Sequence, residues 1–406
     1  MNITRSIEST IVDQLEKDTI LLLIGARQVG KTTLLKHCKA ILTGNKKIVH
    51  YFTLEDPLLL SDLNDHPENI FKYLKKDTTK KSFLLLDEIQ YLNDPSNFLK
   101  YLYDEYQDNL KIVCTGSSAF YIDKRFKDSL AGRKRIIKIF PFSFSEFLKI
   151  KEPSLSELFQ DGGYFEYQRK REFLTPQKRI LLQHWTEYSL YGGYPRVVLE
   201  PEIEEKEFIL AELHQSFLKK DIYESGIKNE LKFFQLIRIL ASQCGELLNQ
   251  NELANTLGVS RTAIENFIYV LTKSFIIDTC PTFQTNLRKE LTKMPKVFMV
   301  DPGYRNSLLS CFKRLESRSD GGAAFENMLY SEFIKSRQKS IKYWRTQDQH
   351  EVDFVVNESS AFECKLSHKK FKTNHYKRFT ESYPDIPLNL VVPEHDTYLD
   401  ILDFCS

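Results

Sequence analysis

The segment from residue 25 to residue 32 constrains the fold of this chain more than any other part of the sequence. It reads Gly25-Ala26-Arg27-Gln28-Val29-Gly30-Lys31-Thr32 and fits the pattern G-x-x-x-x-G-K-[S/T] at each fixed position. The apolar run Thr19–Ile24 precedes it, and the helical run Thr33–Leu42 follows. Glycines let such a loop turn tightly, so that its amides and the first turn of the helix face an anion. The segment therefore predicts a phosphate-binding loop between a strand and a helix.

This loop assigns roles to particular side chains. Lys31 is expected to neutralise the β- and γ-phosphates of ATP, and the hydroxyl of Thr32 is expected to hold Mg²⁺. An ordinary glycine turn is the alternative. The residues expected to contact the nucleotide are Gly25, Ala26, Arg27, Gln28, Val29, Gly30, Lys31, Thr32 and Thr33.

A second apolar run, Phe83–Leu86, ends in the two carboxylates Asp87 and Glu88. At the end of a buried strand, Asp87 can approach the magnesium shell, and Glu88 can orient and deprotonate the attacking water. An acidic pair after a strand is more often an exposed turn. Its distance behind a phosphate-binding loop favours the catalytic role, and the two segments together predict ATP hydrolysis.

Two further polar segments are candidates for the same site. Ser117 follows the apolar run Lys111–Cys114 and could contact the γ-phosphate or the attacking water, although capping of a helix is an equal alternative. Arg133 lies in Ala131-Gly132-Arg133, before the last apolar run of this region. It could act on the nucleotide of a neighbouring subunit, which predicts a homo-oligomer, or belong to a solvated basic loop.

The alternation of elements indicates an α/β fold. Up to about residue 150, β-rich runs alternate with helical stretches, as in a parallel sheet with crossover helices. The β-rich runs are Thr19–Ile24, Ile48–Thr53, Phe83–Leu86, Ile112–Cys114 and Ile136–Phe140. The predicted domains are an AAA-type ATPase domain over 1–150, a helical linker over 151–245, a winged helix-turn-helix over 246–310 and a restriction-endonuclease-like α/β domain over 311–406.

Residues 249–264 have the pattern of a helix-turn-helix. A short helix is expected to end at Gly258, and Ser260 can cap the second helix. The runs Phe275–Cys280 and Lys296–Val300 are predicted to be the strands of a wing. Basic residues between or beside these strands are expected to contact DNA phosphates with little reading of bases, and they are Arg288, Lys289, Lys293 and Lys296. Winged helices also bind proteins, so a protein partner stays open.

Near the C-terminus, Asp353 and Glu363-Cys364-Lys365 form the spacing D-x₉-E-x-K. This spacing resembles the PD-(D/E)xK nuclease superfamily, although Val352 stands in place of the proline. The resemblance implies that Asp353 and Glu363 bind Mg²⁺, with Glu326 as an additional acidic residue, and that Lys365 orients or activates water. Such folds also keep their carboxylates while serving only as binding platforms, so cleavage stays open.

The chain from Gly25 to Phe147 also resembles a family of prokaryotic AAA-type ATPases with a C-terminal domain of unknown function. In this first part the similar segments are Asp87-Glu88-Ile89-Gln90, Thr115–Ser118, Ala131–Arg133 and Pro141–Phe147. In the C-terminal part they are Tyr191–Pro195, Lys220-Asp221, Val300–Gly303 and Glu351–Phe354. The resemblance covers nearly the whole chain and implies an ATPase without indicating its physiological role.

Composition narrows the functional classes. The formal net charge is only +2, so a DNA-binding surface would have to be a local patch. The cysteines form no C-x-x-C pair, which argues against a zinc cluster and a secreted disulfide framework. With neither a signal sequence nor an apolar run of membrane length, we expect a cytoplasmic protein without a membrane partner.

These observations predict an ATP-hydrolysing protein that binds and remodels or processes DNA. Its ATP turnover would be coupled to the winged helix and the nuclease-like domain. The alternative is a nucleotide-dependent signalling or scaffold switch whose C-terminal modules bind protein.

Overall fold

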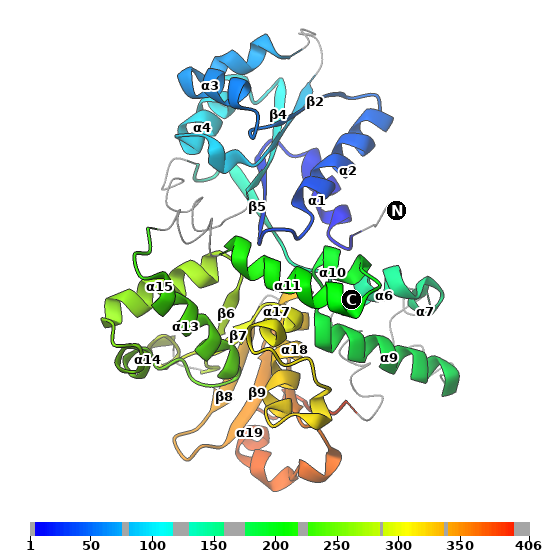
Figure 1. The fold of residues 1–406 in the computed structure, drawn as a ribbon, viewed down its shortest axis with the longest axis vertical. Coiled ribbons are helices and arrows are strands. Elements are labelled where there is room, and N and C mark those ends of the chain that lie inside the picture. The colour runs from blue at the N-terminus through cyan, green and yellow to red at the C-terminus, as the bar shows by residue number, and fades with distance from the viewer. Residues whose placement is uncertain are drawn as a thin grey trace. The chain divides into compact units, whose positions relative to one another are not determined.

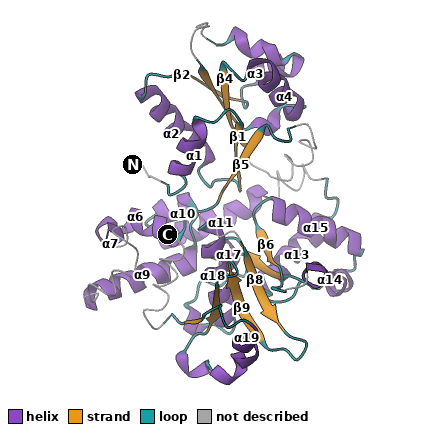
Figure 2. Cartoon of the chain, turned by 180° about the vertical axis from the view of Figure 1, so that it is seen from behind, coloured by secondary structure: helices purple, strands orange, loops and turns teal. Residues whose placement is uncertain are grey.

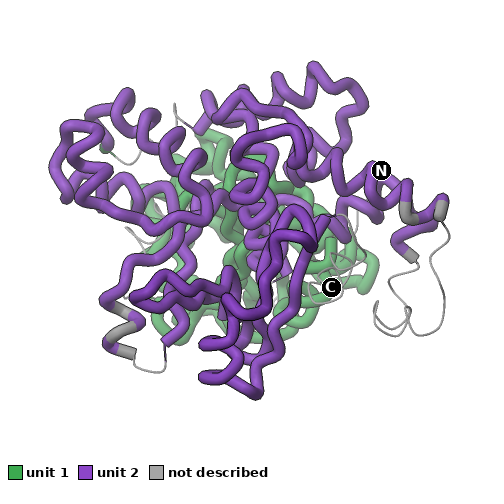
Figure 3. Tube along the Cα trace, turned by 90° about the horizontal axis from the view of Figure 1, so that it is seen from below, with its two compact units in different colours: residues 1–140, 220–226, 273–275 green, residues 141–219, 227–272, 276–406 purple. Residues whose placement is uncertain are grey.

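The computed structural model describes residues 5–74, 81–116, 130–157, 175–217, 226–284, 287–336 and 340–393. The chain divides into two compact units, shown in Figure 3. Unit 1 comprises residues 1–140, 220–226 and 273–275, and unit 2 comprises residues 141–219, 227–272 and 276–406. The finer boundaries predicted at residues 245 and 310 stay predictions.

Unit 1 is built on a five-stranded parallel sheet with the strand order β2-β3-β4-β1-β5 (Figure 1). Every residue of β1 and β4 is buried, as expected for central strands of a parallel sheet covered by helices. The strands are β1 (Ile20–Gly25), β2 (Ile48–Thr53), β3 (Ser82–Asp87), β4 (Leu110–Gly116) and β5 (Lys134–Ile139). The five predicted runs are strands, and the predicted α/β fold class is confirmed.

The helices of unit 1 begin and end at residues suited to those positions. Asp56 accepts a hydrogen bond from the Leu58 amide at 2.9 Å, and Asp94 accepts one from the Asn97 amide at 3.0 Å, so each caps a helix that begins with proline. The helices are α1 (Glu8–Leu15), α2 (Lys31–Gly44), α3 (Pro57–Asp65) and α4 (Pro95–Tyr106), with 3₁₀ turns at Pro67–Lys72 and Ile89–Tyr91.

Unit 2 combines helices with two small sheets (Figures 1 and 2). Its helices are α6 (Phe144–Lys151), α7 (Pro153–Glu157), α9 (Thr175–Tyr191), α10 (Pro195–Leu199), α11 (Ile203–Phe217), α13 (Glu230–Ser242), α14 (Gln250–Leu257), α15 (Arg261–Lys273), α16 (Leu287–Thr292), α17 (Pro302–Leu308), α18 (Gly321–Lys335) and α19 (Lys377–Ser382). Short 3₁₀ turns cover Leu315–Ser317, His368–Lys370 and Thr373–Tyr376. Among the described residues, no helix is both long and apolar enough to cross a membrane.

The two sheets of unit 2 differ in strand direction. Strands β6 (Ile277–Cys280) and β7 (Lys296–Met299) form an antiparallel pair. The second sheet has the order β11-β10-β9-β8, in which only the β10–β11 pair is parallel. Its strands are β8 (Ile341–Arg345), β9 (Glu351–Val356), β10 (Ser360–Cys364) and β11 (Leu388–Val391).

The predicted helix-turn-helix segment does form two helices. α14 ends at Leu257 and is capped by Gly258, whose φ of 64° suits glycine. Ser260 accepts a hydrogen bond from the Ala263 amide at 3.1 Å at the start of α15. The antiparallel β6–β7 pair follows. In the sequence, the connection between these two strands contains α16, a helix that the sequence analysis did not anticipate. Backbone hydrogen bonds of Tyr343 to Pro281 and Phe283 also join the segment after β6 to β8. The winged-helix assignment stays a prediction.

Candidate nucleotide site and carboxylate cluster

The phosphate-binding loop connects the end of β1 to the start of α2. Lys31 is the first residue of α2, and its Nζ donates to the carbonyls of Gly25 at 3.1 Å and Ala26 at 2.7 Å. Gly30 has φ of 92°, a conformation that favours glycine. A Cβ on Gly25 would lie 2.1 Å from the Ile139 carbonyl oxygen, so β5 leaves no room for a side chain there. The loop thus holds the ammonium group beside the first turn of a helix, a place suited to an anion.

Asp87 lies at the same edge of the sheet because parallel strands share the edge where they end. Asp87 is 4% exposed, and its carboxylate accepts hydrogen bonds from the hydroxyls of Tyr51, at 3.2 Å, and Thr115. Burial is the largest cause that raises the pKa of Tyr51, followed by the charge of Asp87, so the phenol stays a hydrogen-bond donor. Neighbours on β2 and β4 therefore hold the carboxylate of β3 in one orientation.

Glu88 follows Asp87 in the left-handed conformation, with φ of 60°. Its backbone amide donates to Thr115 Oγ1 at 2.9 Å, and its carboxylate accepts a hydrogen bond from the Gln90 amide group. A non-glycine residue in this conformation is uncommon and marks a backbone that its surroundings hold in place. Both predicted carboxylates are thus positioned by neighbouring polar groups.

Thr115 is a site residue that the sequence analysis did not select. That analysis chose Ser117 from the same polar segment, and Ser117 lies outside the described residues. Thr115 is fully buried, and its single hydroxyl bonds both Asp87 and the Glu88 amide. It is the first hydroxyl residue after the apolar part of β4, but only the pairing of β4 with β3 shows that it reaches these groups.

The C-terminal carboxylates lie on two neighbouring strands. Phe362 pairs with Phe354 in the antiparallel β9–β10 ladder, which places Glu363 across from Asp353. Glu363 accepts hydrogen bonds from Lys365 and, at 2.9 Å, from the Tyr376 hydroxyl. Burial, followed by the charge of Asp353, raises the pKa of Glu363 to about 7. The sheet thus places Asp353 and Glu363 together, and Lys365 bonds the carboxylate of Glu363.

Lys296 corrects one expectation from the sequence. It was predicted among the basic wing residues that contact DNA, yet its side chain is only 2% exposed. Its Nζ lies 2.9 Å from Glu326, 2.6 Å from Glu351 and 3.9 Å from Asp353. Burial works to lower the pKa of Lys296, but these carboxylates outweigh it and hold the pKa well above its ordinary value. Lys296 is therefore an internal cation that is closed to DNA.

The predicted metal ligands Glu326, Asp353 and Glu363 do not form a site open to a metal ion. Among the described residues, no group of three or more His, Cys, Asp or Glu side chains is arranged to hold one. The ammonium group of Lys296 lies between Glu326 and Asp353, whereas Lys365 and Tyr376 bond Glu363. These residues do not fit a divalent ion.

The N-terminal part of the chain is similar to a known protein family. Residues 17–148 match the model of an AAA domain. Residues 182–315 and 321–402 match two domains of unknown function, DUF8612 and DUF4143.

Relatives extend over most of the chain. An uncharacterized protein of Haemophilus influenzae is 25% identical and covers 85% of this chain and 81% of its own length. An uncharacterized protein of Methanocaldococcus jannaschii is 25% identical over 98% of this chain and 85% of its own length. Among solved structures, the RuvB Holliday junction branch migration motor of Thermotoga maritima has a TM-score of 0.34 and 15% identity, covering 72% of this chain and 95% of that one.

Arg133 lies at the opposite edge of the AAA domain from its own phosphate-binding loop. Its carbonyl accepts a hydrogen bond from the Ile20 amide at 2.8 Å at the start of β1, whereas the loop follows the end of that strand. At ~3.3 Å a residue, the length of β1 separates them by roughly 17 Å. Its guanidinium pairs with Asp104 at 2.6 Å. A role on another subunit's nucleotide stays a prediction.

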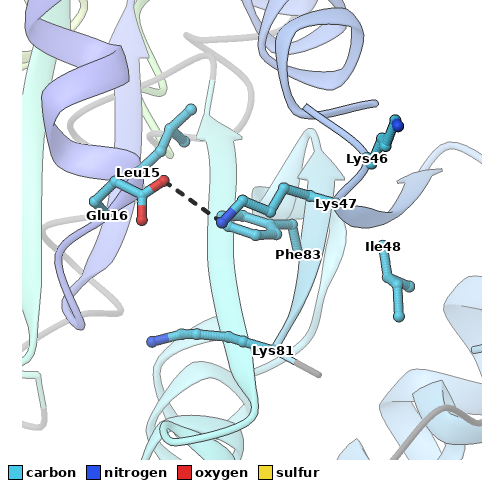
Figure 4. Close-up of a pocket in the computed structure, with 7 residues that line it drawn as sticks. All are labelled: Leu15, Glu16, Lys46, Lys47, Ile48, Lys81 and Phe83. Carbon is cyan, nitrogen blue, oxygen red and sulfur yellow. Dashed lines mark ion pairs between the residues drawn. The ribbon is translucent and has the colours of Figure 1, made fainter. Parts of the chain in front are cut away.

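The AAA domain also has a small cavity at this opposite edge, shown in Figure 4. Its volume is about 250 Å³, and its lining includes Ile48 and Phe83 near the starts of β2 and β3. Lys47 pairs with Glu16 at 4.0 Å beside it. Because the phosphate-binding loop lies where the strands end, this cavity is distinct from the candidate nucleotide site.

Proposed function

We propose that the AAA domain binds and hydrolyses ATP. The observation that carries the proposal is that Lys31, Asp87 and Thr115 lie at the same edge of the parallel sheet, where β1, β3 and β4 end. Lys31 and the loop amides would bind the phosphates, and Glu88 would orient the attacking water and accept its proton. The oxygen atoms of Thr32 and Asp87 suit Mg²⁺, which would neutralise charge on the phosphates when bound.

The test compares two variants in which different steps should fail. Lys31→Ala should weaken nucleotide binding and abolish turnover, because it removes the charge that faces the phosphates. Glu88→Gln should still bind ATP but hydrolyse it very slowly, because an amide cannot take the proton. The measurements are nucleotide affinity and phosphate release. Turnover of Glu88→Gln at the wild-type rate would exclude Glu88 as the base.

We further propose that unit 2 binds DNA with little sequence preference and that ATP turnover remodels or processes that DNA. Support comes from the exposed side of α15, which carries Arg261, Thr262 and Asn266. Arg261 pairs with Glu265 at 2.9 Å, which weakens its attraction for phosphates. The basic residues near α16 therefore carry most of the expected affinity, and a protein-binding scaffold is the alternative function.

Salt dependence tests this second proposal. Replacement of Arg288, Lys289 and Lys293 by alanine should reduce the slope of log affinity against log salt by up to about 3. Each phosphate contact that is lost lowers the number of counterions released when DNA binds. Replacement of Lys228, Lys232 and Arg238 on and beside α13 is the matched control of equal charge. Fluorescence anisotropy with single-stranded, duplex and branched DNA provides the measurement. No binding at low salt would favour the protein-binding alternative.

A further inference from the structure

The carboxylate cluster of unit 2 already holds a cation that belongs to the protein. Lys296 Nζ lies within 4 Å of carboxylates on two elements, Glu326 of α18 and Glu351 and Asp353 of β9. A divalent ion between Glu326 and Asp353 would need the space that this ammonium group takes. It would also meet a like charge there, since the three carboxylates favour the protonated lysine.

The backbone of Lys296 leaves its side chain little freedom to move away. Lys296 pairs with Cys280 in the β6–β7 ladder and forms a further bridge with Leu247. Its Nζ lies 5.7 Å from the centre of the Tyr343 ring, so an aromatic face covers it as well. With a backbone partner on each side and 2% exposure, a side chain moved away from these carboxylates would leave a buried charge unpaired.

Asp353 and Glu363 of the cluster also accept hydrogen bonds from other donors. Asp353 Oδ2 accepts the Cys364 amide at 2.8 Å, and Glu363 accepts Lys365 and the Tyr376 hydroxyl. Glu326 Oε1 accepts a hydrogen bond from Lys296 Nζ at 2.9 Å. Magnesium requires oxygen ligands in near-octahedral geometry at ~2.0–2.1 Å, which oxygens already used by fixed donors do not supply.

We propose that Lys296 is the resident cation of this cluster, in the place of a divalent metal ion. The cluster then binds no Mg²⁺ or Mn²⁺ and does not cleave phosphodiester bonds by metal-activated water. Its role is to fasten β7 to α18 and β9. This inference does not rest on the proposed ATPase function.

Titration of the full chain with Mn²⁺ in the absence of nucleotide tests the proposal, with free Mn²⁺ measured by electron paramagnetic resonance. We expect no bound Mn²⁺ that depends on Asp353. We also expect Mg²⁺ and Mn²⁺ to shift the unfolding temperature equally in the wild type and in Asp353→Asn, because only a ligand bound at this cluster would stabilise the wild type alone. Stoichiometric Mn²⁺ binding that disappears in Asp353→Asn would overturn the proposal. A site that persists in Asp353→Asn lies elsewhere and leaves it standing.

Lys296→Gln tests the converse, which is whether removal of the ammonium group creates a metal site. Removing the ammonium group leaves Glu326, Glu351 and Asp353 facing one another, so this variant should bind one Mn²⁺ and lose it again in Lys296→Gln/Asp353→Asn. Lys342→Gln, which removes a lysine paired with Glu290 and Glu358, is the matched control and should gain no site. If Lys296→Gln folds and binds no Mn²⁺, the proposal that Lys296 takes the place of a divalent metal ion is overturned. If Lys296→Gln does not fold, the wild-type titration still decides.

Discussion

At the scale of single residues, the candidate nucleotide site depends on polar groups that hold one another in place. Lys31 bonds carbonyls of its own loop, and Asp87 is held by hydroxyls from both neighbouring strands. Thr115 serves two partners at once, because its hydroxyl donates to Asp87 and accepts from the Glu88 amide. The side chain that bonds both the carboxylate of Asp87 and the backbone of Glu88 is therefore neither charged nor part of the phosphate-binding loop.

Removing this hydroxyl while keeping the shape of the side chain should slow turnover. In Thr115→Val, Asp87 loses a donor and the Glu88 amide loses its acceptor, so we expect turnover to fall by ~10- to 100-fold with ATP affinity largely kept. Thr115→Ser retains the hydroxyl and should recover most of the rate. Steady-state turnover and nucleotide affinity measure the two effects separately. An unchanged rate in Thr115→Val would contradict the positioning role.

His214 should make unit 2 less stable in mild acid. It is buried against the Tyr304 ring at 4.3 Å between centres, and burial lowers its pKa to about 4. Unfolded histidine titrates near ~6.5, so the unfolded state binds more protons between these values. The stabilisation is present above the unfolded pKa and is lost as the pH falls. Between about pH 7 and about pH 5 this residue should account for a loss of about 2 kcal/mol.

Urea unfolding followed by tryptophan fluorescence measures this loss, because Trp185 and Trp344 both belong to unit 2. His214→Asn cannot take up the proton and should show a drop in unfolding free energy that is smaller by that amount. Equal pH dependence in the two proteins would rule out His214 as the source.

At the scale of elements, the segments Tyr191–Pro195 and Val300–Gly303 are explained by close backbone packing in unit 2. The Gly193 amide donates to Asp301 Oδ2 at 2.9 Å, and a Cβ on Gly303 would lie 2.0 Å from the Tyr191 carbonyl oxygen. Lys335 of α18 completes the network by bonding the hydroxyl of Tyr188 on α9 at 2.8 Å and Asp301 at 3.3 Å. These residue types are therefore needed to join α9, α17 and α18.

Gly193→Ala should destabilise unit 2 strongly. Its Cβ would lie 2.0 Å from the Phe142 carbonyl oxygen, which is backbone and cannot turn away, so we expect a loss of about 4 kcal/mol or more. Gly322→Ala in α18 is the control, since its Cβ would meet nothing within 4 Å and alanine favours helices. Tryptophan fluorescence during urea unfolding compares them. Equal stability of the two variants would refute the packing argument.

At the scale of the whole molecule, the candidate ATP site lies in unit 1, and the helix-turn-helix pair and the carboxylate cluster lie in unit 2. A site in one unit can act on the other only if the nucleotide changes how the units are placed. A neighbouring copy of the chain could also take part, and Arg133 is the residue that would reach its nucleotide. The salt bridge between Arg133 and Asp104 would then have to break, or Arg133 would have to contact Asp104 and the nucleotide together.

Subunit mixing tests this arrangement. Arg133→Ala and Lys31→Ala should each be inactive alone, but in a random equal mixture roughly a quarter of interfaces would combine an intact Lys31 with an intact Arg133. Turnover should therefore recover to that fraction of the wild-type rate, and sedimentation should show an oligomer. A monomeric protein without recovery in the mixture would contradict a homo-oligomer with a shared site.

The sequence by itself determined the features that depend on neighbours along the chain. The strand before Gly25, the loop that ends at Lys31 and the carboxylates after Leu86 could be predicted because apolar runs, glycines and caps act within a few residues. The D-x₉-E-x-K spacing likewise led to the expectation that Asp353 and Glu363 act together, and the antiparallel β9–β10 ladder places them across from each other.

Only the tertiary structure decided the features that depend on which distant segments become neighbours. Thr115 reaches Asp87 because β4 pairs with β3, an order that local patterns do not specify. Lys296 reads as an exposed wing lysine because the sequence around it is basic, whereas β7 in fact carries it against Glu326, 30 residues further along. Burying an unpaired charge costs free energy, so a buried lysine must be paired with carboxylates. Long-range packing alone determines which carboxylates these are.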